Sequence, residues 1–410
     1  MKRERANAPT TPMLEAASGE AAASPSRSVI WPVLPALAAL LLTGDWAIGV
    51  TPDSLNYLRA AENVAHEGYF GADYLHWPPL YPALLALHGL FAVNVMTFAI
   101  CVSKILQLST LAGFWLIARN VAKSAYGLAF GLLVLVCIPQ FQFVFSTVWS
   151  EGLYIPLCIW TVFFWMRYLR ETNGYRDLLL ASVFLALALL TRHVGVVLAF
   201  ALVLSIQRIR TRSLNEKLVA LAATIAATIP YFFWVLRTWK LSGTIGGPRV
   251  PLQGFDPLQK FELFGRVIWH WFAPHSYLQS HGIIIAAVFL GAALLAPLHC
   301  FLVTPRTQDF LRSKHGDGCW LISLLTLFIV GHALLTIITA ARYTLDVDNR
   351  TIFPIFWPTL LLSMHALMVL SMLARSTNSR FSIQAVEILI VGYCTYWFLA
   401  PNSIINTLVS

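Results

Sequence analysis

Residues 44–82 read GDWAIGVTPDSLNYLRAAENVAHEGYFGADYLHWPPLYP and form a polar stretch between two hydrophobic runs. The stretch contains the charged residues Asp45, Asp53, Arg59, Glu62 and Asp73. Nearly all of the remaining chain is apolar enough to lie in lipid. A membrane protein that places so many polar residues in its first loop usually uses them, so the rest of the chain is interpreted around this loop.

Composition identifies the protein as an integral membrane protein. Hydrophobic residues make up 58% of the 410 residues and charged residues only 11%, whereas soluble domains contain about 25% charged residues. Apolar runs close to the ~20 residues that cross a bilayer recur along the whole length. We therefore expect an all-α polytopic bundle of about 11 transmembrane helices, with no internal repeat.

Charge and cysteine usage argue against a nucleic-acid-binding protein and against a protein built on disulfides or metal sites. The net charge of +9 comes from short basic clusters between apolar runs, which is the positive-inside pattern of a membrane protein. Nucleic acid is therefore not expected as a partner. The six cysteines lie within or beside apolar runs without CxxC spacing, which favours small buried hydrophobes over a disulfide or metal framework.

The order of apolar and polar segments predicts the domain organisation. We expect residues 1–28 to be a disordered cytoplasmic tail and residues 29–410 to be a single transmembrane domain without a soluble domain. The alternative for the amino-terminal end is a cleaved signal peptide, because the apolar run at 29–44 is short. Residues 45–92 and 237–281 are predicted to be the first and second outer loops. The carboxyl terminus is predicted outside, and a bacterial inner membrane is the expected location.

Both outer loops carry amphipathic patterns. In the first loop, a helix is predicted to lie on the membrane surface, with Asp53 at its amino-terminal end; its apolar face is Tyr57, Leu58, Ala61, Val64 and Ala65. Pro78 and Pro79 end regular structure before a second short apolar helix at 80–91. In the second loop, one face of another predicted interfacial helix or lid is formed by Phe261, Phe264, Ile268, Trp271 and Phe272.

Residues 177–207 are too long for one crossing. About 30 residues at 1.5 Å rise would make a helix of ~45 Å in a core of ~30 Å, and a single crossing would place the following basic cluster outside. We therefore expect two short helices broken near residues 191–195. Irregular backbone at membrane depth persists only where it lines a cavity, so Arg192 and His193 become candidate site residues.

The outer loops carry the residue types that group transfer from a phosphate carrier requires. The cytoplasmic loops are too short for a nucleotide-binding fold, so an activated substrate has to arrive in the membrane, and a lipid-linked phosphate fits this requirement. A phosphate leaving group needs cationic stabilisation, for which the planar arginine fork is suited. An acceptor hydroxyl needs one carboxylate base, whereas a glycosidase needs a matched carboxyl pair. The outer arginines and carboxylates match the transferase better.

Four stretches resemble the GT-C membrane glycosyltransferases, most closely their protein mannosyltransferase-like and aminoarabinose transferase-like branch. They are Pro52-Asp53-Ser54 with Tyr57, Trp77-Pro78-Pro79-Leu80-Tyr81-Pro82, Thr191-Arg192-His193-Val194-Gly195, and Asp348-Asn349-Arg350 followed by Pro354. The resemblance implies an enzyme that moves a monosaccharide, by inverting displacement, from a polyprenyl-phosphate carrier to a glycan, lipid or protein acceptor on the outer face. Many relatives carry a basic residue directly before the Pro-Pro, where this chain has Trp77.

The resemblance also assigns roles to residues. The acidic residue of the family's first loop, taken as the catalytic base, falls on Asp53, and a second acidic position falls on Glu151. The late arginine thought to approach the carrier phosphate falls on Arg350. The expected substrate-binding set is Tyr57, Trp77, Tyr81, Arg192, His193, Arg342 and Arg350. The alternatives are helix capping for the two carboxylates and headgroup snorkelling for the arginines.

Cofactor use and the competing functions stay open at this point. The histidines lack ligand spacing, and no metal site is assigned, although carboxylate and phosphate oxygens at Asp53 could hold Mg²⁺ or Mn²⁺. The tryptophans fit an aromatic belt, and any one of them could instead stack on a sugar. A lipid-linked glycan transporter or flippase also uses broken helices and buried arginines. A ligase that moves a whole glycan would share the arginines and need a larger outer loop.

Overall fold

The computed structural model describes residues 48–71, 74–122, 125–170, 174–207, 213–248, 256–272, 318–343 and 348–373, with Gly254 and Gly291. The regular secondary structure in these ranges is helical, apart from an isolated backbone bridge between Gly49 and Thr147, and turns and loops connect the helices. The elements are α2 (Pro52–Glu67), α3 (Leu80–Ala86), η1 (Leu87–Phe91), α4 (Val95–Val121), α5 (Ala125–Cys137), α6 (Pro139–Phe145), α7 (Ser150–Arg170), α8 (Tyr175–Thr191), α9 (Gly195–Gln207), α10 (Leu214–Ser242), α11 (Pro257–Phe272), α14 (Gly318–Arg342), α15 (Asn349–Ile352), η3 (Phe353–Ile355) and α16 (Phe356–Leu373).

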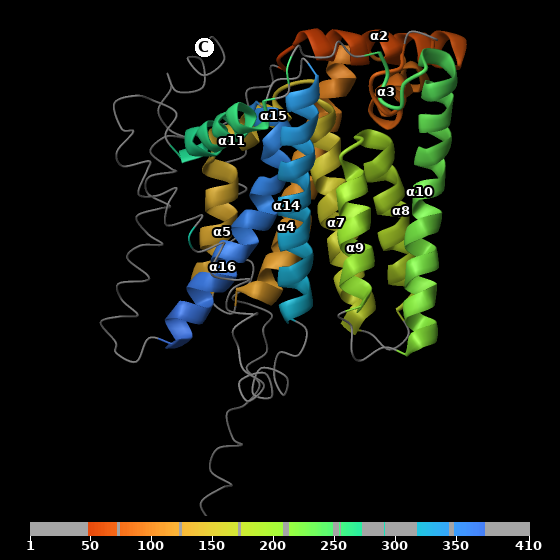
Figure 1. Cartoon of the computed structure of the whole chain (residues 1–410). Helices are drawn as coiled ribbons and strands as arrows, with labels where there is room; N and C mark the ends of the chain where they lie inside the picture. The colour runs from red at the N-terminus through yellow and green to blue at the C-terminus, as the bar shows by residue number, and fades with distance from the viewer. Residues whose placement is uncertain are drawn as a thin grey trace, which may run out of the picture.

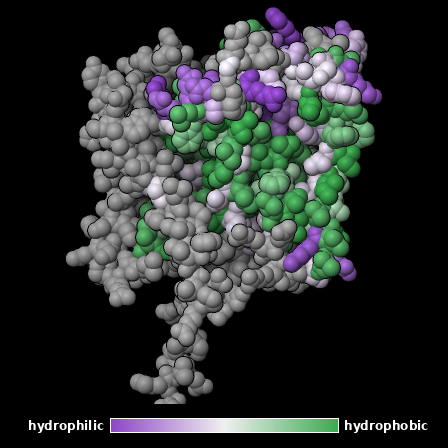
Figure 2. Space-filling view, in the orientation of Figure 1, coloured by the Kyte–Doolittle hydropathy of each residue, from purple (hydrophilic) through white to green (hydrophobic). Residues whose placement is uncertain are grey.

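The long helices form an upright bundle with α2 lying across one end (Figure 1). Five helices are long and apolar enough to cross a membrane, or six if α5 and α6 count as one bent span, all within the described residues. Hydrophobic side chains form a band between more hydrophilic ends (Figure 2). The all-helical membrane class is confirmed for this part of the chain. The total of about eleven crossings stays a prediction, because the tail at 1–28 and the spans expected at 29–44, 282–303 and 383–399 lie outside the described residues.

Helix α2 confirms the helix predicted in the first outer loop. It begins with a reciprocal capping box between Thr51 and Ser54, and it ends at Gly68 in the left-handed conformation with φ 76°, both common helix-end signals. Tyr57 and Ala61 are buried on the face toward the bundle, whereas Arg59 is exposed. The predicted face is therefore the packed face. Its position at a membrane surface stays a prediction.

The segment expected as one span at 125–145 is sharply bent. Helices α5 and α6 meet at Ile138 with an angle of 60° between them. Pro139 has no backbone N–H and disfavours helix at the residue before it, and the Gln142 side chain donates to the freed carbonyl of Val136 at 3.1 Å. The bend brings the chain beside Gly49, whose backbone pairs with Ser146 and Val148. Helix α7 then begins against the first loop.

The break predicted within residues 177–207 is confirmed. Helix α8 ends at Thr191 and α9 begins at Gly195, and the two run side by side with the break near the α2 end of the bundle (Figure 1). A Cβ atom at Gly195 would lie 3.1 Å from the Cα of Leu189. The turn thus requires a residue as small as glycine, and it presents Arg192 and His193 at its tip.

Helix α11 confirms the helix predicted in the second outer loop and most of its packed face. Phe264 and Trp271 are buried and Ile268 packs against the core, whereas Phe261 is 62% exposed. Val267 also packs against the core, because α11 rests on α14 and α15 and these neighbours select the buried stripe. Trp271 contacts Phe356 edge to face at 5.2 Å. Helix α11 therefore braces the segment that carries Arg350.

Candidate active site

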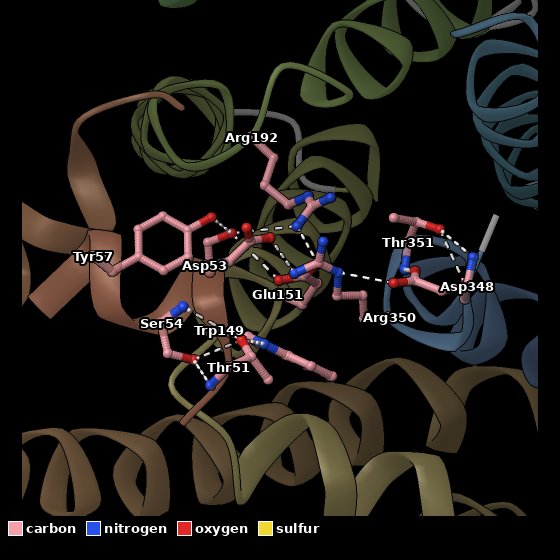
Figure 3. Close-up of polar contacts among 11 residues, drawn as sticks. Thr51, Asp53, Ser54, Tyr57, Trp149, Glu151, Arg192, Asp348, Arg350 and Thr351 are labelled. Carbon is pink, nitrogen blue, oxygen red and sulfur yellow. Dashed lines mark hydrogen bonds and ion pairs between the residues drawn. The ribbon is translucent and has the colours of Figure 1, made fainter. Parts of the chain in front are cut away.

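Two carboxylate–guanidinium pairs meet at the α2 end of the bundle (Figure 3). In the first pair, Asp53 at the start of α2 forms an ion pair with Arg350 in α15, although 297 residues separate them in sequence. In the second pair, Glu151 at the start of α7 forms an ion pair with Arg192 at the α8–α9 break. Four residues from distant parts of the sequence therefore occupy one site.

The turn that begins α15 holds Arg350 in place. Asp348 accepts a hydrogen bond from Arg350 Nε at 3.0 Å through one carboxylate oxygen, and from the Thr351 backbone N–H at 2.9 Å through the other. The guanidinium carbon of Arg350 also lies 5.5 Å from the ring centroid of Trp149, a cation–π distance. Trp149 is itself fixed because its Nε1 donates to Thr51 Oγ1 at 2.9 Å.

The second pair is more deeply enclosed. The Glu151 side chain is only 1% exposed, and that of Arg192 is 21% exposed. Arg192 Nη1 also donates to the Ser150 hydroxyl at 3.3 Å, and the Tyr57 hydroxyl lies 3.1 Å from the same oxygen. Because these contacts join α2, α7 and the α8–α9 break, the second pair also connects the elements that surround the first.

A cavity of about 600 Å³ opens beside the two pairs, within the 300–1,000 Å³ range of ligand pockets. Asp53, Arg350 and Arg192 line it, together with Trp77 and His193 from the expected substrate-binding set. Glu151, Tyr57 and Tyr81 do not line it. They are buried behind the lining residues, where Glu151 contacts Arg192 and the rings of Tyr57 and Tyr81 meet edge to face at 5.2 Å.

The first outer loop forms one wall of the cavity. His193 connects this wall to the bundle, since its Nδ1 lies 2.9 Å from the Tyr231 hydroxyl and its Nε2 lies 3.3 Å from the His76 carbonyl oxygen. Trp77 packs on Tyr57 with ring centroids 5.4 Å apart. The loop is therefore held by the contact of His76 with His193 and by the packing of Trp77 on Tyr57. The Trp77 indole ring faces the cavity as a fixed apolar surface.

Burial shifts the pKa of two groups at the site. Burial, with Glu151 nearby, raises the pKa of Tyr57, so its phenol stays neutral and can donate a hydrogen bond. Burial also raises the pKa of Asp348, and the Arg350 guanidinium opposes that shift. With Asp53 and Glu151, three carboxylates share two guanidinium groups, so the site by itself carries no surplus of positive charge.

The divalent cation considered between Asp53 and a phosphate would have to share the Asp53 carboxylate with Arg350, which already contacts it. Within the described ranges, no group of three or more His, Cys, Asp or Glu side chains could hold a metal ion. Binding of Mg²⁺ or Mn²⁺ at Asp53 stays a prediction.

The structure brings together most, but not all, of the residues expected from the sequence. Arg342 is exposed and stacks at 5.9 Å over Tyr343, outside the cavity lining. Trp149, expected in an aromatic belt, is buried against Arg350 instead. The sequence signal that could have placed Trp149 at the site is its position directly before Ser150-Glu151. The cavity-facing side of α14 was missed, because its threonines lie in an otherwise apolar helix.

Sequence comparison identifies one related family. Residues 76–235 match the family model for dolichyl-phosphate-mannose-protein mannosyltransferases. None of the curated protein sequences matches this chain. The matched range begins at the Trp77-Pro78-Pro79 wall and ends within α10, so it includes Glu151 and Arg192 but not Asp53 or Arg350.

Solved structures of membrane glycosyltransferases share the fold. ArnT from Cupriavidus metallidurans in the apo state aligns with a TM-score of 0.56 at 16% identity, over 89% of this chain and 63% of that one. The same enzyme bound to undecaprenyl phosphate aligns with a TM-score of 0.56 at 15% identity, over 93% of this chain and 70% of that one. The Archaeoglobus fulgidus oligosaccharyltransferase AglB, in complex with an inhibitory peptide and a dolichol-phosphate, aligns with a TM-score of 0.51 at 13% identity, over 92% and 56%.

This chain therefore spans less than two thirds of the apo ArnT chain and of AglB. The likeness nevertheless extends over about nine tenths of the present chain. Together with the family match, it confirms the expected resemblance to the GT-C membrane glycosyltransferases.

Proposed function

We propose that this protein is a glycosyltransferase that moves a monosaccharide from a polyprenyl-phosphate carrier to an acceptor hydroxyl on the outer face of the membrane. One observation carries the proposal: Asp53 and Arg350, a candidate base and a candidate phosphate ligand, meet at a cavity that Arg192 also lines. The GT-C fold, the match to a lipid-phosphate-dependent family and the neighbour bound to undecaprenyl phosphate support it.

The proposed reaction is a direct displacement at the anomeric carbon. The acceptor hydroxyl oxygen forms a bond to this carbon while the bond from the carbon to the phosphate oxygen breaks, which inverts the anomeric configuration. The electron pair leaves on the carrier phosphate, and the hydroxyl proton passes to the Asp53 carboxylate. Such a base contributes about 10² to 10⁴ in rate. No proton donor is needed at the leaving group, because a phosphate already leaves as an anion.

The two arginines would stabilise the charge that develops on the phosphate. A guanidinium group has five N–H donors, and the contacts of Arg350 with Asp53 and Asp348 use two of them. The others can bind phosphate while both carboxylates remain in contact. Arg192 reaches the cavity with its inner side held by Glu151. Preorganised donors of this kind stabilise a transition state without reorganisation during the reaction.

The proposal predicts that purified protein consumes a labelled polyprenyl-phosphate sugar. Membrane vesicles containing the protein should release undecaprenyl phosphate and form labelled glycan, lipid or protein product, and the product should have inverted anomeric configuration. A flippase would move the lipid across the bilayer without consuming it. Movement of intact carrier, with no release of undecaprenyl phosphate from any carrier tested, would refute the proposal.

A further inference from the structure

One face of α14 forms a continuous side of the cavity. The residues that line it recur at helical spacing, and they are His332, Leu335, Thr336, Thr339, Ala340 and Tyr343. Polar residues within a membrane helix are costly unless they face a cavity or a partner. Two threonines, a histidine and a tyrosine on the same stripe therefore give the cavity one polar wall.

Hydrogen bonds within the protein leave two groups of this face as acceptors. Thr339 donates its single hydroxyl hydrogen to the Leu335 carbonyl at 2.6 Å, so toward the cavity its oxygen can only accept. His332 Nε2 lies 2.8 Å from the Thr351 carbonyl oxygen. Because a carbonyl only accepts, Nε2 carries the hydrogen, and Nδ1 of the neutral ring is an acceptor. Among the described residues, Nδ1 has no hydrogen-bond partner.

The cavity is thus divided by chemistry. Arg192 and Arg350 supply donors on one side, and on the other the α14 face offers the Thr339 acceptor and the hydroxyl groups of Thr336 and Tyr343, a group type that can donate and accept. Phosphate oxygens only accept hydrogen bonds, so a phosphate suits the arginines. The α14 face instead suits a ligand whose groups both donate and accept, such as the hydroxyl groups of a sugar, and Leu335 and Ala340 offer contact to its carbon atoms.

His332 also fixes the distance between the two sides. Its bond to the Thr351 carbonyl ties α14 to the residue that follows Arg350. A sugar joined directly to a phosphate at Arg350 has to lie within one ring of that side chain, and the α14 face is the wall tied to it. The acceptor molecule carries no such constraint, because it is not covalently linked to the phosphate.

We propose that the α14 face formed by Thr336, Thr339 and Tyr343, with His332 behind it, recognises the hydroxyl groups of the transferred sugar and so determines which donor is used. This inference rests on the proposed function. It assigns the sugar part of the donor to a helix outside the four stretches that resemble other transferases, and it leaves the phosphate to Arg192 and Arg350.

The test compares two lipids on the same protein. Binding of undecaprenyl phosphate, and of undecaprenyl phosphate carrying glucose, mannose, galactose or a pentose, is measured on purified protein in detergent. In the Thr336→Val and Thr339→Val variants, affinity for the preferred sugar carrier should fall about 3- to 10-fold for each hydroxyl removed. Affinity for undecaprenyl phosphate should change less than about twofold, because its contacts are charge-assisted bonds to arginine.

Thr326→Val is the matched control. Thr326 makes the same type of bond to the carbonyl four residues earlier, at 2.8 Å to Ile322, and it is partly buried as Thr339 is, but it does not line the cavity. This variant should bind both lipids as wild type does, and its thermal unfolding should show the cost of losing a threonine hydroxyl in this helix.

The alternative outcomes separate the two proposals. Equal weakening of both lipids in the threonine variants, unchanged affinity for every sugar carrier, or a change confined to the KM of the acceptor would each overturn the assignment of α14. Wild-type protein that binds the sugar carriers but consumes none of them would refute the proposed transferase activity while leaving sugar recognition by α14 supported.

Discussion

The two ion pairs of the site use the same chemical groups in different surroundings. Asp53 and Arg350 are 25% and 26% exposed and both line the cavity. Glu151 is 1% exposed and reaches the cavity only through Arg192. A partly exposed pair contributes little to stability, about 0 to 1 kcal/mol, and its members can meet a ligand. A buried pair costs several kcal/mol if one partner is removed.

This difference in exposure indicates that Asp53 and Glu151 have different roles. Asp53 touches the cavity, so it can exchange a proton with an acceptor hydroxyl. Glu151 contacts Arg192 and Ser150, and we propose that it positions these two residues. The sequence placed both carboxylates in one catalytic class, and the structure separates them by burial. Four substitutions test whether the two ion pairs differ in this way.

The largest effect is expected for Asp53→Asn. Removal of the base should lower kcat by about 10² to 10⁴, whereas the melting temperature in detergent should stay close to that of wild type, because the pair is partly exposed. The measurement is turnover of a labelled carrier sugar at saturating acceptor, with the unfolding curve recorded on the same preparation. Full turnover by Asp53→Asn would end its assignment as the base.

Arg350→Lys comes next. Lysine keeps the positive charge but loses the planar fork that contacts Asp53 and Asp348 together. Transfer should fall about 10²-fold, the usual cost of one lost transition-state donor, and affinity for undecaprenyl phosphate should fall as well. Arg342→Lys is the control, because Arg342 does not line the cavity. Equal losses in the two variants would show that general surface charge, and not the position of Arg350, matters.

Glu151→Gln should lower stability more than activity, which is the opposite of the effect expected for Asp53→Asn. It leaves the Arg192 guanidinium without its buried partner, so the free energy of unfolding should fall by about 3 kcal/mol. Thermal or denaturant unfolding in detergent measures this loss. Below the melting temperature the remaining activity should exceed that of Asp53→Asn. A stable Glu151→Gln protein without activity would instead place Glu151 among the catalytic residues.

The smallest effect is expected for Trp149→Phe. Phenylalanine keeps an aromatic face near Arg350 but loses the 2.9 Å hydrogen bond to Thr51, which is worth about 1 kcal/mol. The KM for the donor should rise about fivefold at nearly constant kcat, since 1.4 kcal/mol corresponds to a factor of ten. Trp149→Leu removes the ring as well and should raise KM further. Identical values in the two variants would exclude a contribution from the ring.

Local sequence signals were sufficient for most of the helices. The helix at Pro52–Glu67 follows from its capping residues and from the face that contains Tyr57 and Ala61. The break at Arg192 follows from helix length against bilayer thickness. The bend was missed although Pro139 is a local signal for it. The burial of Val267 and the exposure of Phe261 did not follow from the sequence, because they depend on neighbours distant in the chain.

The site could be predicted as a set of residues but not as a geometry. Arg192 stood out because a charged residue at a break between apolar helices is costly, and Asp53 and Arg350 stood out because their motifs resemble those of the GT-C transferases. The sequence could not show that Asp53 contacts Arg350 while Glu151 contacts Arg192, since pairing depends on packing across long distances. The threonines of α14 could not be identified as site residues from the sequence, because threonine is common in membrane helices. Only the structure shows that they line the same cavity.

The backbone bridge at Gly49 has a mechanical consequence. Gly49 donates to the Ser146 carbonyl at 2.6 Å and accepts from Val148 at 3.1 Å, and Thr51 holds Trp149. A swing of α2 away from the bundle would have to break all three bonds at once. These bonds fix the start of α2 and Asp53 to the bundle, so we expect any opening that admits the proposed lipid carrier on the opposite side of the cavity.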